Sequence, residues 1–332
     1  MPIPTRLDDD PSLPTLDPSS SSRVLGIGVT GAIYALDPDT VAKLAPLSDS
    51  PFADNQALED IRVERRIYER LGAHPRICGY VRAVNRGLVL ERLGGSVREY
   101  LVRLRGRDDG RRRGDSGSKR GDQRPSREQA LKWSIQVTEA IAYVHSKGVV
   151  QGDVGCYNFL LDRDGGDDLK LCDFGGSSLD GCALRVGYGV RSRALWKAVE
   201  EEDDSPSVAC ELFALGSALF EMWTGQQPYE ELPDEDVERR YGRLEFPELE
   251  GLVPPGIAEV IRKCWLGKYA SADLILEELQ MFAMESMSLQ RGSDNNSHAL
   301  PSYRPTLPTL TALFVLATTV MICASIFARS RN

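Results

Sequence analysis

The sequence has few of the residues that build metal sites and disulfide frameworks. Among 332 residues there are only three histidines, which lie far apart at positions 74, 145 and 298. The seven cysteines are odd in number and include no Cys-x-x-Cys pair. These shortages disfavour a histidine-rich metal site, a structural zinc site and a disulfide framework, and they favour reduced thiols.

The chain also lacks an overall positive charge. With 49 acidic and 40 basic residues its formal net charge is −9, which argues against a nucleic-acid partner. Apolar residues make up 42% of the chain, which is enough for a sizeable buried core. The one strongly basic segment is 103–127, where ten Lys or Arg residues stand against four Asp residues among many Gly and Ser.

The two ends of the chain differ in character. Residues 1–22 have no apolar run and are rich in Pro, Ser and Asp, which predicts a disordered acidic tail instead of a signal peptide. Residues 287–306 are polar and predict a linker. Residues 310–328 are uncharged, and at 1.5 Å per residue a helix of this length spans a hydrocarbon core of about 30 Å.

We therefore expect a single transmembrane helix over 307–328, followed by a short basic tail over 329–332. A buried core helix is the alternative, but such a helix is seldom apolar on all faces. The expected localisation is a membrane, with the protein tail-anchored and the rest of the chain in the cytosol. Arg329, Arg331 and the modest hydropathy favour the mitochondrial outer membrane over the endoplasmic reticulum.

A glycine-rich segment opens the central part of the chain. Without a Cβ, glycines allow backbone N–H groups to approach phosphate oxygens, and this segment has three of them, at Gly26, Gly28 and Gly31. A turn and the β-prone run Thr40–Lys43 follow, and then a helical pattern that carries Glu64. A lone lysine or glutamate is usually solvated surface, but in this order the two residues are expected to form an ion pair.

Several later segments, together with this opening, resemble the protein kinase family over nearly all of residues 23–286. Leu88–Ser96 is similar to the hinge between kinase lobes, and Ala130–His145 to the long helix before the catalytic loop. Gln151–Asn158 matches that loop at its Asp and Asn, and Leu171–Gly175 contains Asp-Phe-Gly. Two further segments, Phe213–Tyr229 and Cys264-Trp265, resemble landmarks of the large kinase lobe.

The resemblance implies an α+β fold of two lobes, the bilobal protein kinase fold. A small β-rich N-lobe with one regulatory helix would cover about residues 23–92. A larger, mainly helical C-lobe would cover about residues 93–286, with a basic disordered insert at 106–125. A single C-terminal transmembrane helix would complete the chain.

The resemblance also implies ATP and Mg²⁺ as cofactors and assigns roles to individual residues. Asp153 would orient the acceptor hydroxyl and take its proton, while Lys43, held by Glu64, would hold the α- and β-phosphates. Asn158 and Asp173 would bind Mg²⁺. The residues expected to bind ATP, with Leu90 as gatekeeper and the backbone of Glu91 and Leu93 at the adenine, are Gly26, Gly28, Gly31, Ile33, Ala42, Lys43, Leu90, Glu91, Leu93 and Leu160.

The sequence departs from the kinase pattern around the catalytic loop. Gln151-Gly152 replaces the usual His-Arg, so activation by phosphorylation of the activation loop is not expected. Gly155 replaces the lysine two residues after the catalytic aspartate, which removes a cation from the transferring phosphate. In the large lobe, Glu211 replaces an aspartate, and Tyr269 replaces the arginine that usually pairs with a glutamate corresponding to Glu200.

Three functions remain open. The first is an ATP-dependent protein kinase, with Ser/Thr favoured over Tyr, acting on a protein that the sequence does not identify. The second is an ATP-binding pseudokinase that acts as a membrane-tethered scaffold. The third is a small-molecule kinase of the aminoglycoside-phosphotransferase type, which Gly152-Asp153 resembles. Separately, segment 103–127 is expected to be a surface loop, either simply solvated or in contact with anionic lipid.

Overall fold

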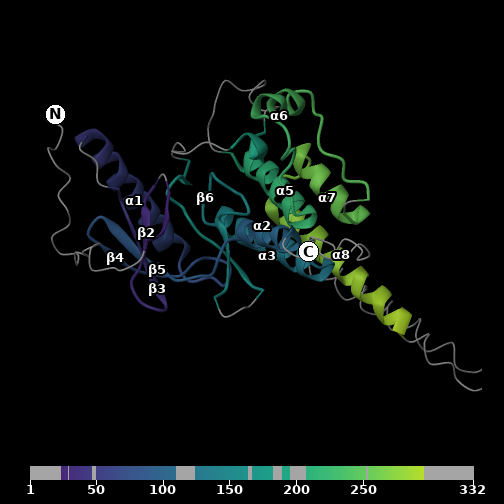
Figure 1. Cartoon of the computed structure of the whole chain (residues 1–332), viewed down its shortest axis with the longest axis horizontal. Coiled ribbons are helices and arrows are strands. Elements are labelled where there is room, and N and C mark those ends of the chain that lie inside the picture. The colour runs from purple at the N-terminus through teal and green to yellow at the C-terminus, as the bar shows by residue number, and fades with distance from the viewer. Residues whose placement is uncertain are drawn as a thin grey trace, which may run out of the picture. The chain divides into compact units, whose positions relative to one another are not determined.

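The computed structural model describes residues 24–28, 30–46, 50–109, 124–163, 167–181, 189–194, 207–251 and 253–294. Chain contacts group Met1–Ser286 into one unit and Met287–Asn332 into another. In the first unit, a five-stranded sheet with one helix is followed along the chain by a mainly helical part (Figure 1).

The five-stranded sheet is antiparallel throughout, with the strand order β1-β2-β3-β5-β4. Its strands are β1 (Val24–Ile27), β2 (Ala32–Ala35), β3 (Thr40–Leu44), β4 (Tyr80–Val84) and β5 (Gly87–Glu91). Lys43 lies opposite Ile33 in β2 and opposite Leu88 in β5. Directly opposed residues project from the same face of a sheet, so these three side chains share one face.

Alternation along β3 divides the packing of the sheet between its two faces. Val41 belongs to the large core cluster that also contains Leu88 and Leu90. Ala42 and Leu44 belong to a separate small cluster, with Val84 and Val89. Lys43 therefore projects toward the main body of the protein, where the functional groups gather.

Helix α1 (Pro51–Leu71) covers the sheet on its Lys43 side. Pro51 occupies the first turn, where its missing N–H costs nothing, and Gly72 ends the helix in the left-handed region at φ 64°. One stripe of the helix is buried, at the spacing expected for a helix with one inward face: Leu58, Ile61, Glu64, Ile67, Tyr68 and Leu71. Glu64 is the charged residue in this otherwise apolar and aromatic stripe.

The second part of the unit consists of helices and short strand pairs. The helices are α2 (Val97–Asp109), α3 (Arg127–Ser146), α5 (Val208–Thr224), α6 (Asp234–Tyr241), α7 (Pro255–Trp265) and α8 (Ala272–Asp294), with a short 3-10 turn, η1 (Val190–Ser192). Strands β6 (Val149–Val150) and β9 (Ser178–Leu179) pair, as do β7 (Phe159–Leu161) and β8 (Leu169–Leu171).

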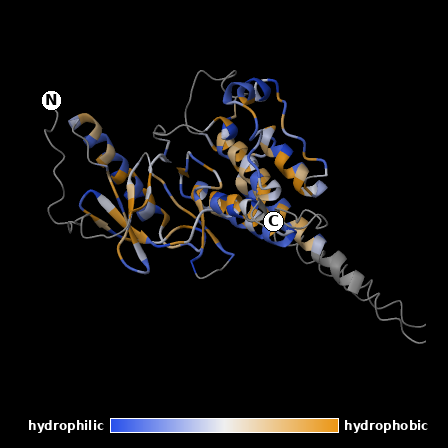
Figure 2. Ribbon diagram, viewed as in Figure 1, coloured by the Kyte–Doolittle hydropathy of each residue, from blue (hydrophilic) through white to orange (hydrophobic). Residues whose placement is uncertain are grey.

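The core of this part is built around α5. Figure 2 shows α5 coloured mainly as hydrophobic and α6 mainly as hydrophilic, in keeping with the burial of nearly every residue of α5 from Glu211 to Trp223. Three buried tryptophans satisfy their indole N–H groups at short range. Trp133 donates to Asp167 O, Trp223 to Ser134 Oγ and Trp265 to Ser217 Oγ, at 2.9, 2.9 and 3.0 Å.

Two helices continue into segments that the sequence predicted to be a loop and a linker. Helix α2 extends to Asp109, so the basic segment expected as a loop over 103–127 begins as helix. Helix α8 extends to Asp294, into the predicted linker 287–306. In both cases no proline interrupts the hydrogen-bond ladder, since the next prolines are Pro125 and Pro301.

Several predicted segments lie outside the described residues. These are the tail 1–22, most of the insert 106–125, the rest of the linker, the membrane segment 307–328 and the tail 329–332. Within the described part of the chain, no helix has both the length and the hydropathy needed to cross a membrane.

Candidate active site

Three charged side chains from three elements meet at the inner face of the sheet. Lys43 in β3 places its Nζ atom 2.7 Å from Oε2 of Glu64 in α1 and 2.6 Å from Oδ1 of Asp173, which follows β8. Lys43 and Glu64 are buried, while the side chain of Asp173 is 43% exposed. The ion pair expected between Lys43 and Glu64 is present, and Asp173 joins it.

Two members of this cluster keep their charges at neutral pH. Burial alone would lower the pKa of Lys43, but the charges of Glu64 and Asp173 raise it above its ordinary value. Burial would raise the pKa of Asp173, yet Lys43 and the donors around it hold that pKa below its ordinary value. At Glu64, burial raises the pKa against the opposing charge of Lys43. At neutral pH, Lys43 is therefore a cation and Asp173 a carboxylate.

The Asp-Phe-Gly turn is tied to α1 through Glu64. Phe174 donates its backbone N–H to Glu64 Oε1 at 3.1 Å, and its ring packs edge-on against Tyr68 of α1 with centroids 5.1 Å apart. Asp173 adopts φ 60°, and its Oδ1 accepts from Gly175 N at 3.2 Å and from Thr30 Oγ1 at 3.4 Å. Thr30 belongs to the glycine-rich turn, so that turn reaches the aspartate across the site.

The catalytic loop between β6 and β7 brings Asp153 and Asn158 together. The side-chain amide of Asn158 donates to Asp153 O at 2.9 Å and to Asp153 Oδ2 at 3.1 Å. Burial raises the pKa of Asp153, while hydrogen bonds from Tyr157 and Asn158 oppose that rise. The two loop residues singled out from the sequence thus form one hydrogen-bonded unit.

Gln151 connects this loop to the Asp-Phe-Gly turn. This connection was not predicted from the sequence. It is fully buried, its Oε1 accepts from Asp153 N at 2.7 Å, and its Nε2 donates to Asp173 O at 2.9 Å. A single amide side chain can both donate and accept, so Gln151 links the backbone of the two aspartates directly. The replacement of histidine at this position therefore leaves the two segments connected.

Glu211 in α5 binds the backbone of the catalytic loop. Its fully buried carboxylate accepts from Gly152 N at 2.6 Å and lies 2.6 Å from His145 Nε2. Gly152 has φ 82°, a conformation that favours glycine and that points its N–H at this carboxylate. The two residues that depart from the kinase pattern at positions 152 and 211 thus bind each other through a hydrogen bond.

The prediction that Ala42 lines the nucleotide site is wrong. Ala42 is fully buried in the cluster with Leu44, Val84 and Val89, on the face of the sheet opposite Lys43. Val41 is the β3 residue that shares the face of Lys43, and it lies opposite Leu90. The period of two along a strand, counted from Lys43, would have identified Val41 from the sequence.

The remaining predicted ATP residues lie in the sheet, in the turn after β1, at the end of β5 and in β7. Ile33 lies opposite Lys43 and Leu90 opposite Val41, while Gly26 is in β1, opposite Ile33. Gly28 donates its N–H to Gly31 O at 2.9 Å, which closes the turn after β1. Leu160 lies in β7 and bridges to Ser96 at the start of the helical part.

At the hinge, the backbone N–H of Glu91 is already in use. It donates to Gly79 O at 2.7 Å, and the Glu91 carboxylate binds Lys170 Nζ at 2.6 and 2.8 Å. Its carbonyl oxygen accepts a long contact of 3.7 Å from the Cys78 thiol. Leu93 follows between Arg92 and Gly94, whose N–H groups donate to Asp39 O and Leu161 O.

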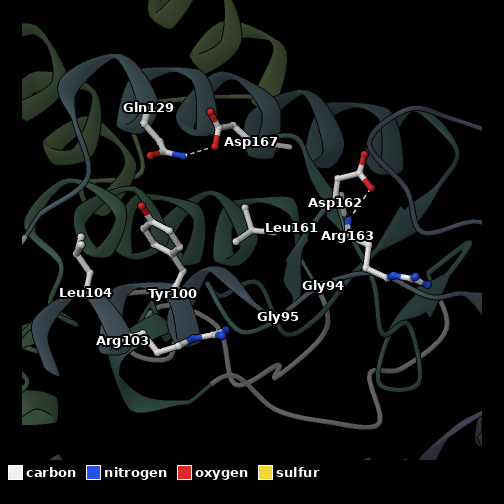
Figure 3. Close-up of a pocket in the computed structure, with 10 residues that line it drawn as sticks. All are labelled: Gly94, Gly95, Tyr100, Arg103, Leu104, Gln129, Leu161, Asp162, Arg163 and Asp167. Atoms are coloured by element: carbon white, nitrogen blue, oxygen red, sulfur yellow. Dashed lines mark hydrogen bonds between the residues drawn. The ribbon is translucent and has the colours of Figure 1, made fainter. Parts of the chain in front are cut away.

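A cavity of about 310 Å³ lies outside this site (Figure 3). Leu161, the neighbour of Leu160 in β7, lines it, and alternation along the strand directs these two leucines to opposite faces. Tyr100, Arg103 and Leu104 of α2 form another part of its wall. No predicted ATP residue is among its lining residues, so the cavity is distinct from the nucleotide site.

The substitution at Tyr269 has a separate structural role. Its hydroxyl donates to Glu278 Oε2 at 2.7 Å, which ties the turn after α7 to α8. Glu200, for which an arginine partner was expected to be missing, lies outside the described residues.

The donor groups of the site suit a magnesium-bound phosphate. The side-chain nitrogen of Asn158 donates to Asp153, so the Oδ1 atom of Asn158 is the oxygen that this side chain can offer to a cation. Asp173 commits Oδ1 to Lys43, Thr30 and Gly175 and leaves Oδ2. Within the described residues no group of three or more His, Cys, Asp or Glu side chains could hold a metal. A site of one carboxylate and one amide oxygen fits Mg²⁺, which keeps waters and phosphate oxygens as its other ligands.

A sheet that presents a paired lysine to a helical part carrying Asp153, Asn158 and Asp173 defines the class of protein as a phosphotransferase of the kinase type. The family model described as protein tyrosine and serine/threonine kinase matches residues 47–271, about two thirds of the chain, and the chain belongs to this family. The β-sheet part is then the N-lobe and the helical part the C-lobe of a bilobal kinase fold. Protein kinases generally use ATP and Mg²⁺.

Curated relatives agree with this assignment. The chain is 28% identical over 254 residues to the probable serine/threonine-protein kinase SIS8 of Arabidopsis thaliana. The matched region covers 73% of this chain and 22% of that protein. A probable serine/threonine-protein kinase of Dictyostelium discoideum is 27% identical over 254 residues, with coverage of 74% and 25%. Mitogen-activated protein kinase kinase kinase 7 of Bos taurus is 28% identical over 172 residues, with coverage of 50% and 29%. The matched region is thus about a quarter of the length of these relatives.

Proposed function

We propose that this chain is an ATP-dependent protein kinase that transfers the γ-phosphate of ATP to a protein hydroxyl. The observation that carries the proposal is the assembled cluster of Lys43, Glu64 and Asp173, with distances of 2.6 and 2.7 Å around Lys43 Nζ. Gln151 joins this cluster to Asp153. These are the groups that phosphoryl transfer requires, and they are connected by hydrogen bonds in a single site.

Each residue then has a role in the transfer. Lys43, held by Glu64, binds the α- and β-phosphates, and Asp173 and Asn158 hold the cation. Mg-ATP supplies the phosphoryl group, and its cation neutralises charge on the phosphates. Asp153 orients the acceptor hydroxyl and accepts its proton as the new oxygen–phosphorus bond forms, while the bond between the γ-phosphorus and the bridging oxygen breaks and ADP leaves.

Serine and threonine are the proposed acceptors, because the relatives matched over most of the chain are named as serine/threonine kinases. The proposal that activity is reduced rests on position 155, where glycine leaves the loop without the usual lysine. The same glycine favours the second candidate, an ATP-binding pseudokinase that serves as a scaffold. The resemblance of Gly152-Asp153 to aminoglycoside phosphotransferases leaves a small-molecule kinase as the third.

A single assay separates the three functions. The full chain in detergent is incubated with γ-labelled Mg-ATP and, separately, with a mixed protein substrate, a peptide library and an aminoglycoside. We expect label on serine or threonine of a protein. Nucleotide binding without transfer to any acceptor would establish the pseudokinase, and label on the aminoglycoside alone would establish the small-molecule kinase. Failure to bind nucleotide would contradict the kinase proposal and the pseudokinase alternative together.

We also propose that residues 307–328 anchor the kinase to a membrane, the mitochondrial outer membrane or the endoplasmic reticulum, with the kinase domain in the cytosol. The full chain should resist extraction by alkaline carbonate, whereas Leu316→Arg/Val320→Arg should be released, since a central Arg costs about 3 kcal/mol to insert. Thr306→Arg, at the edge of the segment, is the matched control and should stay inserted. Extraction of the wild-type chain would refute the anchor.

The basic segment 103–127 is proposed to contact anionic lipid next to that anchor, at about 1 kcal/mol for each basic residue near the surface. Vesicles of increasing anionic lipid content should bind the full chain more tightly than a chain in which Arg111, Arg112 and Arg113 are replaced by serine. Equal binding of the two chains at all lipid compositions would refute the contact.

A further inference from the structure

The missing lysine of the catalytic loop has a structural counterpart in Tyr157. A Cβ built on Gly155 would lie 2.5 Å from Cε1 and 2.9 Å from Cζ of the Tyr157 ring. Real Cβ atoms do not approach other atoms so closely, so the ring occupies the space in which a side chain at 155 would begin. Glycine at 155 and tyrosine at 157 are thus one coupled departure from the kinase pattern.

The Tyr157 hydroxyl is directed at the catalytic aspartate. It donates a hydrogen bond to Asp153 Oδ1, while Asn158 Nδ2 donates to Asp153 Oδ2 at 3.1 Å. Burial and the charge of Asp153 raise the pKa of Tyr157, so the phenol keeps its proton and acts as a donor. Both carboxylate oxygens of Asp153 are therefore held, and each keeps a lone pair for an acceptor hydroxyl.

Arg98 in α2 supports the ring of Tyr157. The guanidinium of Arg98 in α2 lies 4.7 Å from the ring centroid, at the distance of a cation–π contact. Arg98 donates through Nε and Nη2 to the two oxygens of Glu221 in α5, at 2.7 and 2.6 Å. A bidentate pair has a fixed geometry, and the Glu221 side chain is only 6% exposed, so Arg98 is a fixed support.

We propose that Tyr157 is a positioning residue for Asp153, and that Tyr157 with its Arg98–Glu221 support orients the catalytic aspartate in a loop that lacks the usual lysine. The proposal rests on the proposed kinase function in assigning Asp153 to the acceptor hydroxyl. Its structural content, the fixed orientation of one carboxylate, stands independently of catalysis.

The test is Tyr157→Phe in the full chain, which keeps the ring over Arg98 and removes only the hydroxyl. We expect kcat to fall about tenfold, the loss of one hydrogen bond to a charged group, with KM for ATP changed less than twofold. Tyr269→Phe is the matched control, because it removes a hydroxyl bonded to Glu278 away from the loop, and should behave as wild type.

An unchanged or increased kcat in Tyr157→Phe would overturn the proposal. If the wild-type chain transfers no phosphate, crystal structures of the wild-type chain and of Tyr157→Phe supply the answer without catalysis. An Asp153 carboxylate that changes its orientation in Tyr157→Phe supports the positioning role even where the kinase proposal fails. An unchanged orientation overturns it.

A second pair of variants tests the coupling between positions 155 and 157. Gly155→Lys should lower activity in the wild-type background, because its Cβ collides with the Tyr157 ring. In the Tyr157→Ala background the same lysine has room and should raise activity above that of Tyr157→Ala alone. Equal effects of Gly155→Lys in the two backgrounds would show that the two positions are independent and would contradict the proposal.

Discussion

Replacing Asp153 with asparagine should reduce phosphoryl transfer about 10²- to 10⁴-fold, the range that a positioned proton acceptor contributes. Asparagine has the same shape but cannot accept the proton of the acceptor hydroxyl. Its amide group must also face the donors Tyr157 and Asn158, of which only one can find an acceptor oxygen. Both effects act on the loop and leave Lys43 and Asp173 in place.

Nucleotide affinity separates this outcome from unfolding. In Asp153→Asn, the affinity for Mg-ATP should stay within about threefold of wild type, because the hydrogen bonds of Asp153 are to residues of its own loop. Asp162→Asn is the matched control, since this half-buried aspartate lies outside the loop and its carboxylate accepts from Arg163 N, and it should transfer at the wild-type rate. Transfer by Asp153→Asn within threefold of wild type would remove Asp153 from the mechanism.

Replacing Lys43 with methionine should abolish transfer and also destabilise the protein. Glu64 would then be buried without its cation, and breaking a buried pair from one side costs about 3–5 kcal/mol. For a domain of this size, we expect the midpoint of thermal unfolding to fall by roughly 10 °C. Lys263→Met, which breaks a partly exposed pair with Glu278, should cost about 1 kcal/mol or less.

The double variant Lys43→Met/Glu64→Gln distinguishes the two losses. Glutamine carries no charge to leave unpaired, so the double variant should recover most of the stability and none of the transfer. The stability deficit of Lys43→Met should also grow with pH. Burial without the cation raises the folded-state pKa of Glu64, so the folded state binds a proton that it must release as pH rises. A double variant no more stable than Lys43→Met would show that Lys43 stabilises the fold by other contacts.

Residue type and order were enough to select residues that the structure brings together. Lys43, Glu64, Asp153, Asn158 and Asp173 were identified from motifs, and short contacts connect them. The prediction at Ala42 was wrong because it relied on motif spacing instead of strand alternation. Helices α2 and α8 continue into the segments predicted as a loop and a linker, because polar, glycine-containing segments can still continue a helix when no proline stops them.

The departures from the kinase pattern needed the structure for their interpretation. From the sequence, Gln151, Gly155 and Glu211 were replacements of the residues expected from the kinase pattern. In the structure, Gln151 bonds to the backbone of both aspartates and Glu211 accepts from Gly152. Whether a substitution removes a contact or replaces it depends on which atoms it reaches, and the sequence alone does not give those positions.

The sequence by itself determined the family, the two lobes and the residues that meet in the candidate site, because each rests on residue types and their order along the chain. Only the tertiary structure decided that Val41 shares the face of Lys43 and that Tyr157 holds Asp153 with Arg98 and Glu221 behind it. The physical reason is that Arg98, Tyr157 and Glu221 lie up to 123 residues apart in the chain and meet only through the packing of α2 and α5 against the catalytic loop.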